Sequence, residues 1–322
     1  MTVCRDADPR QKARAPGLVW PPGRRLTSAP MTDVCVVGSV NLDLSLAVDA
    51  LPRPGETVLA SSLRQAPGGK GGNQAVAAAR AGARVQFVGA VGDDAAAGQL
   101  RAHLQANGVG LDGAVEIPGP SGTAIVVVDA NAENTIVVAP GANGRFTLND
   151  ERARAVLAGC DVMLIQLEIP VATAVAAARH ARSGGAVVVV NASPAGRDPD
   201  SLSELAAAAD VVITNEEEAS EWPWRPRHLV VTLGSHGARY VGADGEYSVP
   251  SPDVDAVDTT GAGDVFAGVL AANWPLEPGS PDQRRLALRR ACAAGALATL
   301  VPGAGDCAPR AEEIERALRG KS

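Results

Sequence analysis

Residues 162–190, VMLIQLEIPVATAVAAARHARSGGAVVVV, contain one complete unit of an α/β fold. The short apolar run at 162–165 is typical of a buried strand, and the Ala-rich run at 171–181 is typical of a helix. The second apolar run, at 186–190, is expected to be the next strand. A strand, a helix and a strand in this order predict two parallel strands joined by a crossover helix.

The same alternation extends along the chain in both directions. We expect further strands at 34–38, 85–91, 211–214 and 229–233, and helices at 74–81, 95–107, 202–208, 262–272, 283–300 and 310–318. Short β-branched runs between longer helical runs favour a sheet with helices on both faces. The predicted class is therefore α/β, a three-layer sandwich around a central, mostly parallel sheet.

Two segments, about 44–66 and 118–138, interrupt this alternation. The first carries Pro52, Pro54 and Gly55 between apolar positions, and the second contains two strand-like runs around a turn. These segments are expected to form a small antiparallel β-sheet outside the main one.

Composition and charge exclude several classes of protein. The chain has 322 residues, and its net charge of −7 argues against a nucleic-acid binder or a basic membrane-surface protein. Its apolar runs are too short to span a bilayer. The five cysteines show no C-x-x-C spacing, which argues against a disulfide framework or zinc ribbon and favours a cytoplasmic protein.

Residues 1–30 differ from the rest of the sequence. They are rich in Pro, Arg and Asp and show no apolar period. We expect either a disordered tail or a start assigned upstream of the true initiator, Met31.

Three short segments rich in Gly and polar residues offer candidate binding groups. The first, GSVNLD at 38–43, follows a predicted strand, where α/β sheets bind ligands, although an Asx-stabilised turn also explains it. The second, GGKGGNQ at 68–74, enters a helix and offers free N–H groups, or is a flexible turn with a solvated lysine. The third, DTTGAGD at 258–264, suits developing negative charge at a helix N-terminus. In it, Asp264 is either a general base or an acidic residue stabilising the helix dipole.

Taken in order with four shorter elements, these segments resemble the ribokinase family, also called the PfkB carbohydrate kinases. The segments at 68–74 and 258–264 are similar to the two family signatures, and 38–43 is similar to the start of the family domain. The shorter elements are QLE at 166–168, NASPA at 191–195, NEEE at 215–218 and TLGSHG at 232–237. Residues 31–322 are therefore expected to form one kinase domain.

The resemblance implies ATP-dependent phosphorylation of D-ribose at O5. It also implies that the segments at 44–66 and 118–138 form a β lid that covers the sugar and joins two subunits in a homodimer. Asp264 would be the general base, and the anion hole would come from Gly261, Ala262 and Gly263. The pentose would be surrounded by Asn41, Asp43, Gly69, Lys70, Asn73, Glu168 and Asp264.

ATP and two metal ions are implied in the same way. The nucleotide would contact Asn191, Glu218, Thr232, Gly234, Ser235, Gly237 and Gly263, and Glu218 would hold Mg²⁺ through water. A monovalent cation, K⁺, would lie among Asp258, Thr260, Ala298, Val301 and Gly303, with Cys307 near it.

The sequence departs from the family pattern in two places. Few residues separate Asn215 from the strand at 229–233, where the family usually has a further helix, so the adenine pocket is expected to be more open. Cys307 stands where relatives commonly have Ser, which puts the potassium site in doubt.

Other functions stay open at this point. The chain is alternatively a PfkB-family kinase for another sugar or a nucleoside, or a catalytically weak sugar-binding protein of the same fold, which the intact Asp264 disfavours. A nicotinamide-dependent oxidoreductase is disfavoured because no G-x-G-x-x-G follows the first predicted strand.

Overall fold

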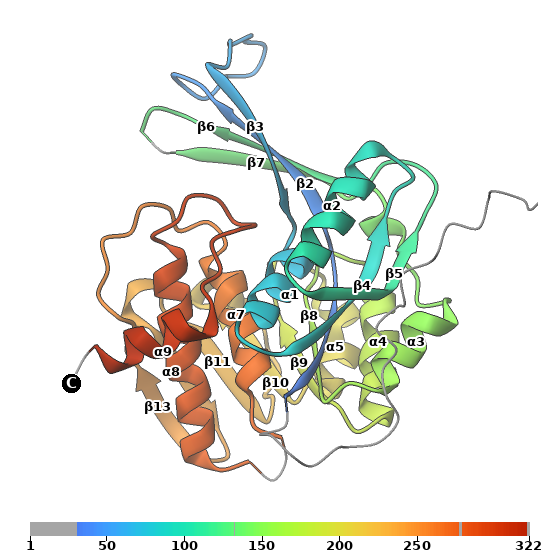
Figure 1. Cartoon of the computed structure of the whole chain (residues 1–322), viewed down its shortest axis with the longest axis vertical. Helices are drawn as coiled ribbons and strands as arrows, with labels where there is room; N and C mark the ends of the chain where they lie inside the picture. Colours follow the sequence, from blue (N-terminus) through green and yellow to red (C-terminus); the bar gives the residue numbers. More distant parts are fainter. Residues whose placement is uncertain (1–30, 132, 277–278, 321–322) are drawn as a thin grey trace, which may run out of the picture.

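A nine-stranded sheet forms the centre of the molecule, in the order β13-β12-β11-β10-β9-β8-β1-β4-β5. The computed structural model describes residues 31–131, 133–276 and 279–320 (Figure 1). The prediction of a disordered tail or an upstream start at 1–30 lies outside these described residues. The strands are β1 Asp33–Val37, β4 Arg84–Val91, β5 Val109–Glu116, β8 Val162–Ile165, β9 Val187–Asn191, β10 Val211–Asn215, β11 His228–Thr232, β12 Ala238–Gly242 and β13 Gly245–Val249.

The predicted mostly parallel sheet is confirmed. Every neighbouring pair from β11 to β5 is parallel, and only β12 and β13, at one edge, pair antiparallel. The parallel strands therefore all place their carboxyl ends along the same edge of the sheet.

Helices cover both faces of this sheet, as predicted (Figure 1). On β1, Val34 and Val36 belong to one hydrophobic core, Cys35 and Val37 belong to the other, and all four are 0% exposed. Burial on both faces explains why the central strands are continuously apolar instead of alternating. One layer contains α1 Lys70–Arg80, α2 Ala95–Ala106, α7 Ala262–Asn273, α8 Pro281–Ala298 and α9 Ala311–Arg319, and the other contains α3 Glu151–Ala158, α4 Val171–Ser183 and α5 Pro199–Ala208.

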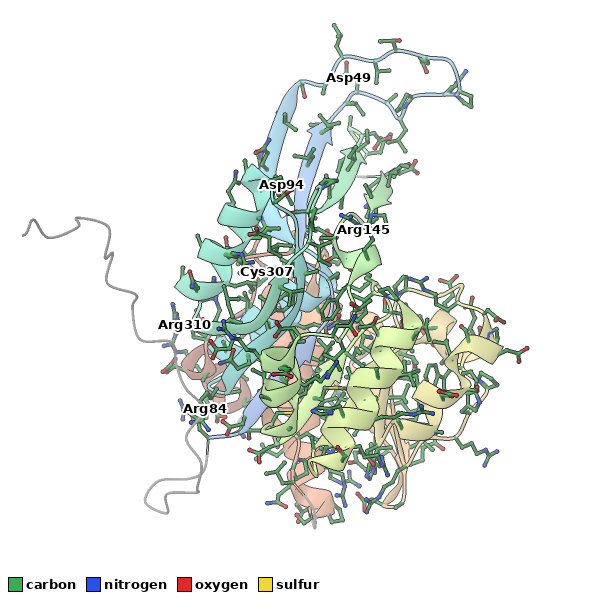
Figure 2. All side chains as sticks on the ribbon, turned by 90° about the vertical axis from the view of Figure 1, so that its right-hand side faces the viewer. Asp49, Arg84, Asp94, Arg145, Cys307 and Arg310 are labelled. Atoms are coloured by element: carbon green, nitrogen blue, oxygen red, sulfur yellow. The ribbon has the colours of Figure 1, made fainter. Side chains whose placement is uncertain are left out.

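A separate four-stranded sheet projects from the body (Figures 1 and 2). Its order is β3-β2-β6-β7, from β2 Asn41–Ala47, β3 Ser62–Gly68, β6 Gly122–Val128 and β7 Asn134–Ala139. The prediction of a small second sheet is confirmed, but the prediction that it is wholly antiparallel is wrong. Its middle pair, β2 and β6, is parallel because both strands run outward from the body, and β3 and β7 return on either side. Asp49 lies near the outer end of this sheet (Figure 2).

The segment between β10 and β11 is short and contains one helix. A short helix, α6 Glu216–Glu221, lies there and is closed by a capping box between Asn215 and Glu218. Beyond it, the rings of Trp222 and Trp224 meet edge to face at 5.0 Å, and Trp222 is buried. The segment is therefore compact, although α6 has only six residues.

No helix in the described ranges is both long enough and apolar enough to cross a membrane. The four cysteines within those ranges are buried free thiols.

Candidate active site

The candidate site lies at the carboxyl edge of the parallel strands, where the chain order of the sheet reverses. From β1 the sheet continues to β4 on one side, whereas β8 to β11 extend it on the other. Ligands of doubly wound sheets bind at such a switch point. Ser39, after β1, donates its hydroxyl hydrogen to the carboxylate of Glu168, after β8, and the backbone N–H of Lys70 donates to the same carboxylate at 3.2 Å.

The candidate base, Asp264, is held by two amide donors. It lies in the first turn of α7, 8% exposed, and its Oδ2 accepts from Asn73 Nδ2 at 3.0 Å. Its Oδ1 accepts from Gln74 Nε2, also at 3.0 Å. These contacts require α7 to lie directly against α1, which Gly268 allows, because a Cβ there would be 2.4 Å from the backbone oxygen of Gln74.

Polar groups from β2 form one side of the site. Asn41 is buried, and Asp43 Oδ1 is buried without a hydrogen-bond partner among the described residues. Burial raises the pKa of Asp43 to about 7, and the nearby charges of Glu168 and Asp264 add to this rise. A carboxyl group in this setting favours a neutral form or a partner that donates hydrogen bonds to it.

Asn143 connects this side of the site to the body, and the sequence analysis did not identify it. Its Oδ1 accepts from Val40 N at 3.1 Å, and its Nδ2 donates to Val40 O at 3.1 Å and to Asn41 Oδ1 at 2.8 Å. Asn143 thereby fixes which end of the Asn41 amide points toward the site. Its neighbours in the sequence, Gly141 and Gly144, offered only a general turn signal.

Two glycines are required by the backbone around the site. Gly69 has φ 84°, and a Cβ there would be 2.7 Å from the backbone nitrogen of Asn41. Gly261, the N-cap of α7, has φ 80°, and a Cβ there would be 2.8 Å from Ala304 Cα. Both positions therefore exclude a side chain on conformational and steric grounds.

The N-terminus of α7 supplies the candidate anion hole. The N–H of Val265 donates to Gly261 C=O, and the N–H of Ala262 donates to Thr259 C=O at 3.3 Å. The first-turn N–H groups of Gly263 and Asp264 have no acceptor within an α-helix and point toward its N-terminal end. Of the predicted groups, the N–H of Gly263 therefore has no acceptor in the first turn of α7, whereas that of Ala262 already has one.

Two adjoining cavities bring all seven of the predicted nucleotide residues together. A cavity of about 310 Å³ includes Thr232, Gly234, Ser235, Gly237 and Gly263, and its far wall is apolar, with Phe266, Cys292 and Ala296. A second cavity, of about 180 Å³, shares Thr232 and Gly263 with the first and is lined by Lys70, Asn191, Glu218, Gly261 and Asp264 as well. The larger cavity thus leads through the smaller one to the candidate base.

Lys70 contacts Glu168 through its backbone and lines the 180 Å³ cavity. Burial lowers the pKa of its ammonium group, but the carboxylates of Asp264, Glu168 and Glu218 outweigh burial and raise that pKa above its usual value. Its ammonium group is therefore charged, and it lines the 180 Å³ cavity together with Asp264 and Glu218. The sequence analysis expected Lys70 beside the sugar, and in the structure Lys70 shares this cavity with Asn191 and Glu218, which were expected to contact the nucleotide.

The predicted cation residues form two linked loops. Asp258 Oδ1 accepts from Thr260 N at 2.9 Å and its Oδ2 from Gly303 N at 2.8 Å. Although burial would raise the pKa of Asp258, these hydrogen bonds hold it below its usual value. Cys307 Sγ lies 3.9 Å from Thr260 O, and Ala298 O accepts from Val301 N at 3.2 Å. The loops thus present one carboxylate and several carbonyl oxygens.

Fold and site together define a phosphotransferase of the sugar-kinase class, with a cleft that ends at a buried carboxylate beside a projecting β-sheet. The chain belongs to the pfkB family of carbohydrate kinases, whose family model matches residues 31–311. The family resemblance noted in the sequence is therefore confirmed, and the chain is a carbohydrate kinase.

Two relatives and one solved structure show how similar the chain is to individual kinases. The chain is 38% identical to a ribokinase of Bacillus subtilis over 303 residues, which cover 89% of this chain and 100% of the relative. It is 33% identical to a deoxyribokinase of Salmonella typhi over 260 residues, 74% of this chain and 84% of the relative. The solved structure of an Arabidopsis thaliana ribokinase complexed with ribose and ATP matches with TM-score 0.79 and 28% identity, covering 90% of this chain and 99% of that one.

Sequence reasoning assigned no role to several buried polar residues of the site. Ser39, Gln74 and Gln166 lie in the segments at 38–43, 68–74 and 166–168, but functions were assigned only to neighbouring residues in these segments. A polar residue at a buried position of an apolar helix or strand end was the signal that could have identified them.

Proposed function

We propose that this chain transfers the γ-phosphoryl group of ATP to O5 of D-ribose. The observation that carries the proposal is the position of Asp264, which is buried at the N-terminus of α7 and faces both Asp43 and the 180 Å³ cavity. The ribokinase of Bacillus subtilis and the ribose- and ATP-bound ribokinase of Arabidopsis thaliana support the choice of substrates.

On the sugar side, the side chains of Asn41, Asp43 and Glu168 are expected to bind the secondary hydroxyl groups. Asp264 accepts the proton of the primary hydroxyl as its oxygen bonds to the γ-phosphorus, and the bond between that phosphorus and the β–γ bridging oxygen breaks. A carboxylate is a sufficient base because the proton leaves as the O–P bond forms. Asn73 and Gln74 keep the carboxylate oriented throughout.

On the nucleotide side, we assign the base to the 310 Å³ cavity, between Gly234 and the apolar wall of α7 and α8, and the phosphates to the 180 Å³ cavity. The Lys70 ammonium and the N–H groups of Gly263 and Asp264 are placed to stabilise the negative charge that develops on the transferred group. Fixed positive groups of this kind stabilise a phosphoryl-transfer transition state.

Glu218 is the group proposed to hold Mg²⁺ through water. One of its carboxylate oxygens accepts from Asn215 N at 2.8 Å, and the residue is 8% exposed on the wall of the phosphate cavity. A single carboxylate with phosphate oxygens and waters fits the ligand preference of Mg²⁺. When bound, the ion would neutralise phosphate charge.

We assign K⁺ to the loops of Asp258 and Gly303. No group of three or more His, Cys, Asp or Glu residues in the described part of the chain is arranged to hold a metal ion, so a transition-metal site does not fit. One carboxylate and backbone carbonyls suit a hard cation. Burial raises the pKa of Cys307 to about 11, so its thiol is neutral, donates to Ala304 O at 3.3 Å and brings no charge to the proposed cation site.

The projecting sheet is proposed to act as a lid and to join two subunits of a cytoplasmic homodimer. All six residues of its edge strand β7 are exposed, including the apolar Ile136, Val137 and Val138. Exposed apolar residues on an unpaired edge strand are a typical surface for association with a second copy.

The first experiment is ADP release with Mg-ATP and a panel of ribose, 2-deoxyribose, fructose and adenosine, with KCl or choline chloride. We expect the highest kcat/KM with ribose and stimulation by K⁺. A preference for 2-deoxyribose would favour the second candidate, which the similarity to the Salmonella typhi deoxyribokinase supports. Equal rates in KCl and choline chloride would remove the potassium site from the proposal.

A further inference from the structure

Two glutamines lie behind the candidate base, Gln74 on α1 and Gln166 after β8. Both are 0% exposed. Gln74 Nε2 donates to Asp264 Oδ1 at 3.0 Å and to Asn191 Oδ1 at 2.9 Å, and Gln166 Nε2 donates to Gln74 Oε1 at 2.7 Å. The amide group of Gln74 therefore joins Asp264, at the start of α7, to Asn191, at the end of β9.

The direction of each hydrogen bond in this network follows from its two ends. The ionised carboxylate of Asp264 can only accept, and so can the carbonyl of Ile213, to which Asn191 Nδ2 donates at 3.3 Å. Asn191 must therefore present its oxygen to Gln74, and Gln74 must present one hydrogen to each neighbour. If the Gln74 amide were turned over, oxygen would oppose oxygen at two contacts, so only one orientation is stable.

We propose that Gln74 is a positioning residue that couples the base to the nucleotide side of the site, and that Gln166 fixes the orientation of Gln74. This inference rests on the proposed function, because it gives Gln74 a part in the same transfer. Asp264 and Asn191 both line the 180 Å³ cavity, whereas Gln74 is wholly buried behind them and acts through them. With Asn73 on Oδ2 and Gln74 on Oδ1, each carboxylate oxygen keeps a lone pair for the attacking hydroxyl.

Gln166 has a feature that fold stability does not explain. Its Oε1 is buried and makes no hydrogen bond to any part of the chain that the structure describes. A buried carbonyl without a partner destabilises a fold. A Cβ at Gly38 would be only 1.8 Å from this oxygen, so the glycine leaves room for the amide of Gln166 in its present position. An apolar side chain would fill the same space, but it would not hold Gln74 in its orientation.

The test compares Gln74→Met and Gln166→Met with the wild type, since Met keeps the length of the side chain and removes the amide. For Gln74→Met we expect kcat to fall about 10- to 100-fold, the scale of a slightly misplaced catalytic group, while the KM for the sugar changes less than about threefold. Lys70, Asp43 and Cys307, which interact electrostatically with Asp264, are unchanged in this variant.

For Gln166→Met we expect a smaller fall in kcat with a Tm close to that of the wild type, because the variant removes the unpartnered carbonyl of Gln166 but leaves Gln74 Oε1 without its donor. A merely structural role would lower kcat and Tm together. The matched control is Gln86→Met on β4, a glutamine 2% exposed that bonds Asp112 through both ends of its amide, at 3.1 and 3.2 Å. This control should lose Tm and keep its kcat.

An unchanged kcat in Gln74→Met, or a rise in the KM for the sugar as large as the fall in kcat, would overturn the inference and leave the proposed function standing. A fall in kcat that follows the fall in Tm across all three variants would overturn it as well. A wild type without turnover on any sugar of the panel would instead overturn the proposed function, and this inference with it.

Discussion

Asp264 carries one amide donor on each carboxylate oxygen, which is the arrangement expected of a base that must not rotate. Asp264→Asn keeps the size of the side chain and removes its basicity. We expect kcat to fall ~10²–10⁴-fold, the usual contribution of general base catalysis, with ATP and ribose binding largely retained. Because the new NH₂ opposes a donor from Asn73 or Gln74, Tm should fall as well. Single-turnover kinetics measure the rate of transfer, calorimetry measures the binding of ATP and ribose, and thermal unfolding measures Tm. An unchanged kcat would exclude Asp264 from the mechanism.

Asp43 makes stability depend on pH. Its pKa in the folded chain is about 7, against an ordinary value of 3.8. Between these values the folded chain holds a proton that the unfolded chain has lost, so this residue makes the protein less stable as pH rises through that window. Asp43→Asn should therefore raise Tm more at pH 8 than at pH 5, while it raises the KM for the sugar. The measurement is thermal unfolding of the wild type and the variant at pH 5 and pH 8. An equal rise in Tm at both pH values would contradict the raised pKa of Asp43.

At the scale of elements, the start of α7 depends on Gly261. Alanine there would have to adopt φ 80° with its Cβ 2.8 Å from Ala304 Cα. Such a conformation costs roughly 1–3 kcal/mol, and any relief would displace the anion hole and Asp264 together. Gly261→Ala should therefore lower both Tm and kcat. The control is Gly98→Ala in α2, where a Cβ would have no heavy atom within 4 Å. Its free energy of unfolding should rise by about 0.5–1 kcal/mol, and its activity should be unchanged.

Hydrophobic pattern alone predicted the central elements closely. Expected strand 34–38 is β1 Asp33–Val37, and expected helix 171–181 is α4 Val171–Ser183. Their sequences are continuously apolar or Ala-rich, and such signals are local. β5 and β12 were not predicted, because glycine and charged residues interrupt their apolar pattern. They are strands because β5 pairs with β4, and β12 pairs with both β11 and β13, so pairing outweighs local propensity.

At the scale of the whole molecule, the proposed dimer depends on the exposed edge strand β7 of the projecting sheet. If β7 joins two subunits, a charge on its exposed face should separate them, because burying an unpaired charge is costly. Val137→Lys is expected to shift the protein from dimer to monomer in sedimentation experiments and to raise the KM for the sugar. Leu286→Lys, at an exposed apolar residue on α8, is the control and should stay dimeric. A wild type that sediments as a monomer at all concentrations would contradict the proposed dimer.

By itself, the sequence determined the α/β class, the family and many of the residues that line the two cavities. These properties depend on local signals, such as apolar runs and glycine motifs at helix starts, that can be read without knowing which segments meet. Only the tertiary structure decided that Asn73 and Gln74 hold Asp264, across 191 and 190 residues of chain. It also decided that Asn143 orients Asn41 and that Lys70 lies beside the phosphate cavity. The physical reason is that a buried side chain takes whichever partner the packing of distant elements brings within about 3 Å, and sequence spacing does not contain that distance.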